Sequence, residues 1–464
     1  MSETQGQPGL RFTAVFVAAM MLALMFVGLR AIDVSQKAEG GGEGLVVRQA
    51  IFAGVGLAAF AVAVLVPYQR IGRLAYPLFI LTLALLLLLA AARFFHLNLG
   101  PIRNQRGAYR WIDLGVFQIQ PSELAKLSLI LLLAWYLRLG DHYRKLLGLV
   151  PPFVLTLVPT FLILIEPDLG TAILFLPILF VMLFLAGARK RHLLSILGIA
   201  AVCMVLPVPQ STAGMDPREL AERLQTCYWP RAESAEQLRL WQKDPPAMIL
   251  SAAPLAVMED HQLERISGWL LQGDESVAHG KGYHLRQSLI VLGSGKAWGS
   301  RDWSDGRYYF RMLPDDHTDF IFSIIAGQWG FAGCAIVLGF YAVIVLVGVE
   351  IAATTNDPFG RLLAGGVVGL LVAQVCINIG MTMGLMPITG MTLPLVSYGG
   401  SSLVINCAAL GLLVNVAQRR PILLGRRPFE HKENTSHLPY RPLEERRDHS
   451  SSRATSAGSF PVRM

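Results

Sequence analysis

The chain has 464 residues, of which 53% are hydrophobic and only 16% are charged, and its formal net charge is +8. A soluble globular domain carries roughly 25% charged residues. The composition therefore excludes an ordinary soluble protein and indicates an integral membrane protein. The five cysteines have no metal-ligand spacing, and they suggest no disulfide framework.

Ten segments qualify as membrane spans, each of which needs about 20 mostly apolar residues. They lie at about 12–30, 47–67, 75–92, 122–139, 147–165, 169–188, 193–209, 320–350, 362–386 and 400–417. The first has the length of a signal peptide, but no small-x-small cleavage site follows it, so we expect a retained helix. The sequence thus predicts an all-α polytopic membrane protein with about ten transmembrane helices.

The Lys and Arg residues of short loops predict the orientation, because these residues favour the cytoplasmic side. With both termini in the cytoplasm, the inner segments hold Arg11, Arg70, Arg73, Arg138, Arg144, Lys145, Arg189, Lys190, Arg191, Arg361, Arg419 and Arg420. One outer cluster breaks the rule, and it consists of Arg103, Arg106 and Arg110. Two readings of it stay open: it contacts an anionic partner, or it pairs with carboxylates of its own loop.

One connection, between the seventh and eighth spans, is exceptionally long. Residues 210–317 are expected to form this large extracytoplasmic loop, in which we interpret 210–253 as an insertion and 259–309 as functional. Residues 421–464 are rich in Arg, Ser and Pro and poor in large apolar residues, which is typical of a disordered basic tail in the cytoplasm. The predicted organisation is therefore a transmembrane domain over 1–420 followed by this tail.

Asp319 is the most informative residue of the chain. It stands where a polar segment meets a long apolar run, since Phe320 to Val349 contains no Asp, Glu, Lys or Arg. A carboxylate drawn to the centre of a bilayer costs roughly 2.5–3.5 kcal/mol, so such residues are rare and usually functional. We therefore interpret Asp319 as the centre of a functional site.

Two further outer segments carry charged residues next to turn residues. Pro121 starts a helix on which Glu123 and Lys126 are three residues apart, share one face and can pair. This pair either anchors the end of the span or contacts a substrate. In the turn before Leu169, Asp168 is expected to cap the following helix.

Two glycine-rich segments complete the candidate motifs. The segment Gly282–Gly295 is amphipathic and could lie at the membrane interface, with backbone N–H groups turned to an anion. Leu393–Ser402 combines proline, glycines and serines before the last span, which favours a re-entrant loop buried in protein over an ordinary tight loop. Asn378 in the ninth span is expected to form hydrogen bonds between helices.

Together these motifs resemble the SEDS family (shape, elongation, division and sporulation), whose members include RodA and FtsW, and the resemblance leans toward RodA. It extends over nearly the whole chain up to about residue 420. The motifs that carry it are Trp111–Gly115, Gln120–Lys126, Pro167–Thr171, Gln287–Ser288, Gly293–Gly295, His317–Phe322 and Leu393–Ser402.

The resemblance implies a peptidoglycan glycosyltransferase of the bacterial plasma membrane, which polymerises lipid II in the outer leaflet during elongation or division. The essential aspartate of the family falls on Asp319, which would act as general base. The implied partners are lipid II, a class B penicillin-binding protein and membrane lipids, with no nucleic acid. Lys126, Arg110, Arg265 or a divalent cation, Mg²⁺ or Mn²⁺, would supply positive charge for the leaving pyrophosphate; no other cofactor is implied.

The remaining residues that the resemblance implies for the substrate site surround Asp319 in the matched motifs. They are Arg110, Trp111, Gln120, Glu123, Lys126, Arg265, Gln287, Ser288, His317, Thr318, Ser397, Tyr398, Gly399, Gly400 and Ser401. The chain departs from the family pattern at Gly327 and Gln328, where members carry two glutamates, at Arg311, where many are acidic, and at Glu166, where glutamine is common. Two alternatives stay open: a non-catalytic scaffold for a cell-wall synthase, and a lipid II flippase.

Overall fold

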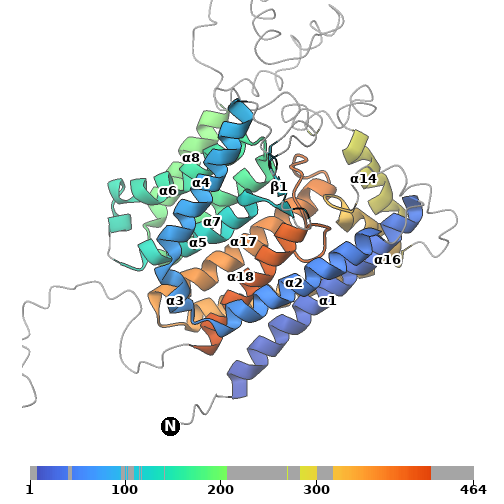
Figure 1. Cartoon of the computed structure of the whole chain (residues 1–464), viewed down its shortest axis with the longest axis horizontal. Coiled ribbons are helices and arrows are strands. Elements are labelled where there is room, and N and C mark those ends of the chain that lie inside the picture. Colours follow the sequence, from blue (N-terminus) through green and yellow to red (C-terminus); the bar gives the residue numbers. More distant parts are fainter. Residues whose placement is uncertain are drawn as a thin grey trace, which may run out of the picture. The chain divides into compact units, whose positions relative to one another are not determined.

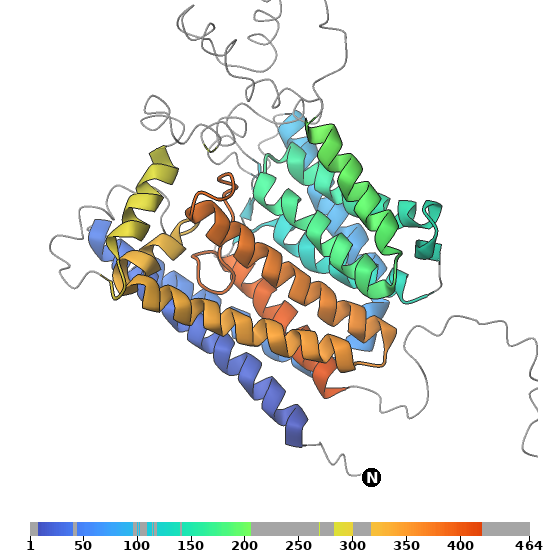
Figure 2. The same cartoon turned by 180° about the vertical axis from the view of Figure 1, so that it is seen from behind.

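The computed structural model describes residues 8–39, 44–95, 100, 102, 109–113, 115, 118–139, 142–205, 269, 283–299 and 317–419, all within one compact unit. These residues form helices and one short β-ribbon (Figures 1 and 2). The first elements are α1 (Pro8–Glu39), α2 (Gly44–Leu65), α3 (Tyr68–Arg73), α4 (Ala75–Phe94), β1 (Ile112–Asp113), β2 (Gln118–Ile119) and α5 (Pro121–Leu137). Then follow the 3-10 turns η1 (His142–Arg144) and η2 (Leu147–Leu149), and the helices α6 (Val150–Ile165), α7 (Leu169–Ala186), α8 (Lys190–Val205), α14 (Tyr283–Ser294), α16 (Ile321–Thr354), α17 (Pro358–Thr382) and α18 (Gly400–Gln418).

The all-α polytopic fold is confirmed, and every predicted span falls on a helix. Among the described residues, eight helices are long and apolar enough to cross a membrane by themselves. The fourth and seventh predicted spans correspond to α5 and α8, which have 17 and 16 residues. Helix α5 begins at Pro121, one residue before the predicted span, and ends two residues earlier than predicted, because the chain leaves the helix at Arg138.

Helices α17 and α18 are the most buried of the eight. Small residues let α17 approach its neighbours closely: side chains of α7 lie against Gly365 and Gly369, and both Ile130 of α5 and Met182 of α7 lie against Gly366. Small residues at contacts are the usual means by which membrane helices associate. The peripheral helix α2 is mostly exposed, as expected for a helix that faces lipid.

Helix α16 is broken at Gly330, whose φ of 65° and ψ of −162° are not helical. The backbone of 295–299 fits into this break, where Phe331 N–H donates to the carbonyl of Lys296 at 2.9 Å and Ala332 N–H to that of Ala297 at 3.0 Å. The part of α16 that can span a bilayer is therefore the 24 residues that follow Gly330, about 36 Å at 1.5 Å per residue.

Residues 383–399, between α17 and α18, form a non-helical loop, which is exposed at Met383, Leu385 and Met386 and mostly buried in protein from Ile388 to Ser397. Its polar groups are paired with several helices: Asn378 donates to the carbonyl of Met391, and Tyr341 Oη donates to that of Pro394. From α2, Gln49 Nε2 donates to the carbonyl of Ser397 at 3.1 Å. Backbone that leaves the helical pattern inside a membrane needs such partners.

The bundle has two ends that matter below (Figures 1 and 2). We call the end with α14, the β-ribbon and the 383–399 loop the α14 end, and the end with α3 the α3 end. The Lys and Arg distribution predicts that the α14 end is extracytoplasmic. The predicted insertion 210–253, most of the large loop and the predicted tail 421–464 lie outside the described residues.

Candidate active site

Asp319 lies in a turn, 317–320, that leads into α16 at the α14 end. Its side chain is half-buried, and its carbonyl accepts a hydrogen bond of 3.0 Å from Asn378 Nδ2 of α17. The same amide nitrogen donates to the carbonyl of Met391, so one side chain joins the Asp319 turn to the buried loop. Asn378 is itself fully buried, and this fixes the backbone on which the Asp319 carboxylate is mounted.

His317 and Tyr398 hold the other side of this turn. Tyr398 N–H donates to the carbonyl of His317 at 2.9 Å, and the two rings are 5.7 Å apart in an edge-to-face arrangement. Ser397 Oγ accepts from Leu393 N–H at 2.8 Å inside the loop. The predicted residues His317, Thr318 and Asp319 are thus brought together with Ser397 and Tyr398.

A second polar network joins β2, α5, α7 and α18. Ser401 Oγ donates to the carbonyl of Gln118 at 2.7 Å and accepts from Gln120 N–H at 3.2 Å. Gln120 Nε2 and Ser122 Oγ both donate to Asp168 Oδ2, at 2.9 and 3.0 Å. The other oxygen of Asp168 accepts from Thr171 N–H, so the expected helix cap forms and also ties three helix starts together.

The predicted pair of Glu123 and Lys126 is present, with Oε2 and Nζ 2.7 Å apart. Only 1% of the Lys126 side chain and 7% of the Glu123 side chain are exposed. Gly366 of α17 contacts Ile130 of α5, and α5 and α17 enter the bundle from opposite ends. The ion pair lies in the first two turns of α5 and is buried inside the bundle.

The α6–α7 turn is held by two arginines. Arg110 Nε donates to the carbonyl of Glu166 at 2.9 Å and its second nitrogen donates to that of Pro167, while Arg93 donates to the carbonyl of Ile165. The carboxyl oxygens of Glu166 are buried and have no hydrogen-bond partner among the described residues. Burial, reinforced by the charge of Asp168, raises the pKa of Glu166 well above its ordinary value of 4.5, although Arg110 and Arg93 oppose the shift.

Helix α14 carries two predicted site residues with different surroundings. Ser288 is fully buried, where its hydroxyl lies 2.7 Å from that of Ser323 and donates to the carbonyl of Thr382 at 2.9 Å, so it joins three helices. Gln287 is half-buried on the same helix. Gly327, one of the two positions at which the sequence departs from the expected family pattern, lies in tight backbone contact with Gly295.

The other predicted residues have mixed outcomes. Trp111 lies half-buried just before β1, and Gly399 and Gly400 form the start of α18, where Gly400 packs on Phe52. Arg265 lies outside the described residues, as do Arg103, Arg106 and Arg311. Within the described part of the chain, no group of three or more His, Cys, Asp or Glu side chains could hold a metal ion, so we derive no step through a metal.

Sequence reasoning missed two contributions to the site, from Asn378 and Gln49, and a third buried amide, Gln374. Asn378 was expected to link helices, but its partner, the backbone of Asp319, could not be read from the sequence. Gln49 and Gln374 are single amides inside apolar runs, a pattern that signals an internal hydrogen bond without naming its partner. Both are buried, and the amide atoms of Gln374 have no partner among the described residues.

The fold and the site define a class: a polytopic, all-helical membrane protein with a carboxylate on a hydrogen-bonded turn at one end of its helix bundle. The chain matches the family described as "Cell cycle protein", which groups FtsW, RodA and SpoVE, over residues 10–214 and 235–421. The match covers most of the chain, and the protein therefore belongs to the SEDS family. The family alignment is interrupted over 215–234, outside the described residues.

Individual relatives agree with this assignment. Peptidoglycan glycosyltransferase RodA of Treponema pallidum (strain Nichols) is 35% identical over 343 residues, which are 68% of this chain and 79% of that protein. Probable peptidoglycan glycosyltransferase FtsW of Geobacter metallireducens is 32% identical over 374 residues, covering 80% of this chain and 84% of that protein. The RodA relative is slightly more similar, by a small margin.

A solved structure gives the same fold. A chain from "Structural coordination of polymerization and crosslinking by a peptidoglycan synthase complex" superposes with a TM-score of 0.63 at 29% sequence identity. The superposition covers 90% of this chain and 100% of that chain. The architecture is therefore that of the SEDS fold.

Proposed function

We propose that this protein is a peptidoglycan glycosyltransferase that joins the disaccharide-pentapeptide units of lipid II in the outer leaflet, during cell elongation or division. The 4-hydroxyl of one sugar attacks the anomeric carbon of another. A glycosidic C–O bond forms, the C–O bond to the lipid pyrophosphate breaks, and the lipid pyrophosphate leaves. Asp319 accepts the proton of the attacking hydroxyl.

The observation that carries this proposal is the fixed position of Asp319. A general base acts only when it is held within hydrogen-bond reach of the proton it removes, and it then contributes roughly 10²–10⁴-fold to the rate. The clamp of Asn378 and the contact of His317 with Tyr398 supply such a fixed turn at the membrane boundary. The relatives are named as a peptidoglycan glycosyltransferase and a probable one, which supports the same reaction.

The roles of the basic residues differ from each other in this proposal. Arg110 donates to backbone carbonyls of the α6–α7 turn, so it contributes positive charge near the site while it holds that turn. Lys126 is buried and paired with Glu123, and we assign the pair to positioning the start of α5. Arg265 is proposed to meet the leaving pyrophosphate.

The proposed partner is a class B penicillin-binding protein that cross-links the new strand. The structure similar to this chain comes from work on polymerisation and crosslinking by a peptidoglycan synthase complex, which supports such a pairing. In this orientation the α14 end, with the Asp319 turn, faces the outer leaflet where lipid II and the partner's transpeptidase domain would meet it.

The experiment is a lipid II polymerisation assay with the purified full-length protein and its partner, read as glycan length on a gel. We expect Asp319→Asn to lower the rate at least about 100-fold, because the amide cannot accept the proton. Asp33→Asn is the matched control, since Asp33 pairs with Lys37 on α1, outside the proposed site. It should polymerise as the native protein does.

Three other outcomes would contradict parts of the proposal. Polymerisation that survives Asp319→Asn would reject the base. A native protein that stays inactive with its partner across Mg²⁺ and Mn²⁺ titrations, yet stimulates the partner's cross-linking, would be a scaffold. Transfer of lipid II across vesicles without glycan elongation would indicate a flippase.

A further inference from the structure

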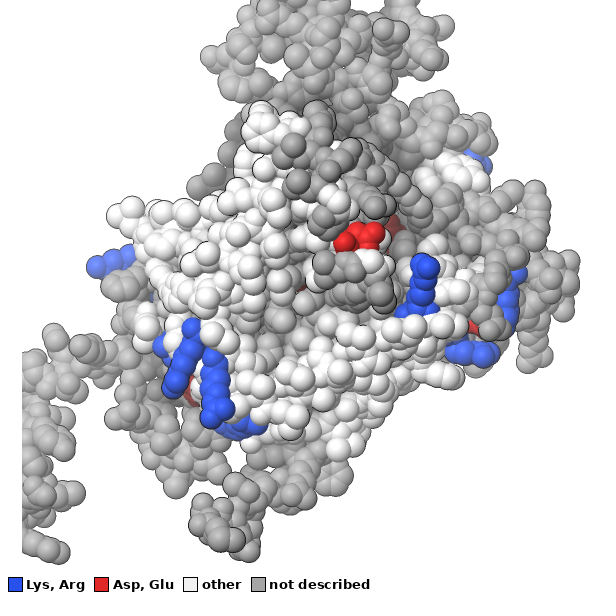
Figure 3. Space-filling model, in the orientation of Figure 1, with Lys and Arg blue, Asp and Glu red and all other residues white. Residues whose placement is uncertain are grey.

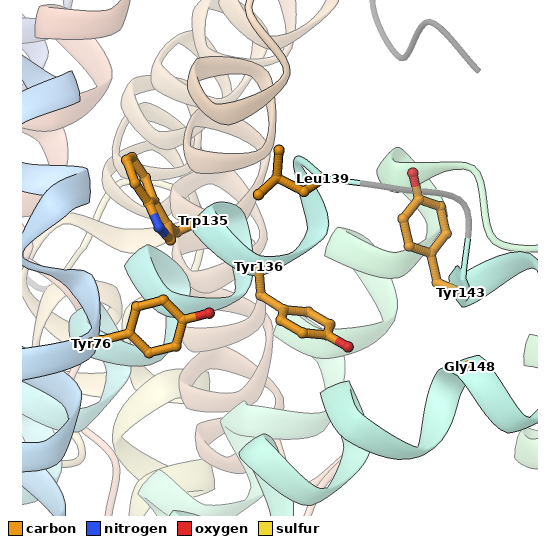
Figure 4. Close-up of a pocket in the computed structure, with 6 residues that line it drawn as sticks. All are labelled: Tyr76, Trp135, Tyr136, Leu139, Tyr143 and Gly148. Atoms are coloured by element: carbon orange, nitrogen blue, oxygen red, sulfur yellow. The ribbon is translucent and has the colours of Figure 1, made fainter. Parts of the chain in front are cut away.

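Aromatic side chains line a cavity of about 230 Å³ (Figure 4), which lies at the α3 end of the bundle. Its lining residues are Tyr76, Trp135, Tyr136, Leu139, Tyr143 and Gly148. They come from the start of α4, the last turn of α5, Leu139 just beyond that helix, and the 3-10 turns. Aromatic rings with polar tips favour the interface between lipid headgroups and acyl chains. The cavity is therefore built from the residues that suit a lipid at that depth.

Basic residues flank the cavity on two sides. On one side α3 packs against Trp135 through Gly72, and it carries the exposed Arg70 and Arg73. On the other side, the turn that supplies Tyr143 continues into the exposed Lys145. Lys and Arg side chains gather on the surface over α3 (Figure 3). A phosphate placed at the mouth of the cavity would thus lie between two positively charged segments.

Arg138 adds a charge at the wall of the cavity. Its guanidinium lies 3.2 Å from the centre of the Trp135 ring, and it has no hydrogen bond or ion pair within the described part of the chain. The nearby acid Asp357 is already engaged, since its Oδ2 accepts from Tyr68 Oη and from Gly360 N–H, both at 2.9 Å. Arg138 therefore lies near the negative charge of Asp357 but is not hydrogen-bonded to it within the described part of the chain.

Exposed apolar side chains surround the same charges. Leu139 is 67% exposed, and Leu146 and Leu147 are 57% and 86% exposed, directly after Lys145. Leucines beside lysine and arginine are typical of segments that lie in a membrane interface, with the charges at the headgroups. The rim of the cavity is thus in contact with the bilayer rather than with water alone.

We propose that this cavity binds one anionic phospholipid from the leaflet at the α3 end, which the charge bias predicts to be the cytoplasmic leaflet. The acyl chain lies against Tyr76, Tyr136 and Leu139, and the phosphate lies between α3 and Lys145. Both halves of the site are needed, because the aromatic cavity alone would take any lipid and the charges alone would take any phosphate.

The test measures which lipids stay bound to the purified full-length protein. The protein is equilibrated with equal amounts of phosphatidylglycerol and phosphatidylcholine in micelles, passed over a sizing column, and its retained lipids are counted by native mass spectrometry. We expect the native protein to retain phosphatidylglycerol preferentially. The triple variant Arg70→Gln, Arg73→Gln, Lys145→Gln should lose this preference roughly tenfold or more, because each basic residue near an anionic surface contributes several-fold to binding.

The chain offers a matched control at the start of α8 and the residue before it. Arg189→Gln, Lys190→Gln and Arg191→Gln together remove three exposed charges that the sequence places on the same side of the membrane, and retention should not change. Leu139→Trp keeps all charges but fills the rim, and it should lower retention of both lipids.

Specific results would overturn the site. It is rejected if the triple variant retains phosphatidylglycerol as the native protein does, or if the control loses as much. Displacement of the lipid by excess inorganic phosphate would show a phosphate site rather than a phospholipid site. All variants should elute as monodisperse protein, and a column profile like that of the native protein makes each comparison valid.

Discussion

At the scale of single residues, Glu166 is the most unusual side chain near the site. It is a carboxyl group in a buried turn, and the two neighbouring arginines bind backbone carbonyls instead of its oxygens. A buried carboxyl without a bonded partner favours its neutral form. In its neutral form the Glu166 side chain is chemically similar to glutamine, which the family resemblance leads us to expect at this position.

The raised pKa of Glu166 gives a prediction for stability against pH. The unfolded chain releases this proton near pH 4.5 and the folded protein only at higher pH, so the folded state binds more protons between the two values. The free energy of unfolding therefore falls as pH rises above 4.5. Glu166→Gln removes this loss, and we expect a higher Tm than that of the native protein at pH 8.

Thermal unfolding in detergent at pH 5 and pH 8 measures this difference. The gap between Glu166→Gln and the native protein should widen at pH 8. Glu350→Gln, on an exposed carboxyl of α16, is the control and should shift Tm little at either pH. An equal shift for Glu166→Gln at both values would contradict the neutral carboxyl.

At the scale of elements, Asn378 joins α17 to two non-helical segments. Asn378→Ala removes both donations, to Asp319 and to Met391, so the Asp319 turn is no longer fixed. A misplacement of about 1 Å at a reacting group can lower a rate about 10²-fold. We expect this variant to lose polymerisation rate on that order, with less effect on the apparent affinity for lipid II.

The measurement is the polymerisation rate and the apparent affinity for lipid II, determined separately for Asn378→Ala. A general loss of stability would not lower the rate while leaving the affinity nearly unchanged. Asn406→Ala is a matched control, because Asn406 is a buried amide whose donations go to Ser402 within its own helix. If Asn378→Ala and Asn406→Ala lose the same amount of rate, Asn378 has no positioning role.

The break in α16 gives the next prediction. Gly330 has a φ of 65°, and a Cβ there would lie 2.3 Å from Gly299 N. A left-handed backbone costs a non-glycine residue about 1–2 kcal/mol before any clash. Gly330→Ala should therefore lower Tm by several degrees, on the scale of about 2–8 °C per kcal/mol for ordinary domains.

A control for this prediction lies in the same helix. Gly339 has no atom within 4 Å of the place where a Cβ would stand. Gly339→Ala should leave Tm unchanged or raise it, because alanine favours a helix over glycine by roughly 1 kcal/mol. Similar losses for both variants would mean that the break does not require glycine.

The sequence predicts individual helices and loops better than it predicts the contacts between them. The uncharged run after Phe320 predicts a helix, and the proline and glycine content of 384–402 predicts the buried loop, because both depend on local chemistry. The break at Gly330 could not be predicted, since a glycine in an apolar run is common in membrane helices. It arises from the backbone of 295–299, which lies some thirty residues earlier.

In the candidate site, too, features set by local sequence could be predicted and features set by tertiary contacts could not. Asp319 and the pair of Glu123 and Lys126 could be found because charges inside apolar sequence are rare. Ser288 forms a hydrogen bond between helices, and Arg110 forms hydrogen bonds to a backbone turn. Both depend on tertiary packing, which no local sequence pattern contains.

At the scale of the whole molecule, the orientation in the membrane decides whether Asp319 meets lipid II. We predict that Trp298→Cys, in a cysteine-free background, reacts with a membrane-impermeant maleimide in intact cells, because Trp298 is 81% exposed at the α14 end. Lys145→Cys, at the α3 end, should react only after the membrane is opened. The reverse pattern would place Asp319 in the cytoplasm and reject the proposed reaction.

The amide hydrogens of Phe331 and Ala332 are bonded to the carbonyls of Lys296 and Ala297, and not to their own helix. Their replacement by deuterium therefore requires the segment after α14 to lift away from α16, whereas the neighbouring helix amides need no such movement. The rate of deuterium uptake at these two amides therefore measures how often the segment after α14 separates from α16. A transpeptidase that bound α14 would slow deuterium uptake at these two amides, even if it made no contact with α16.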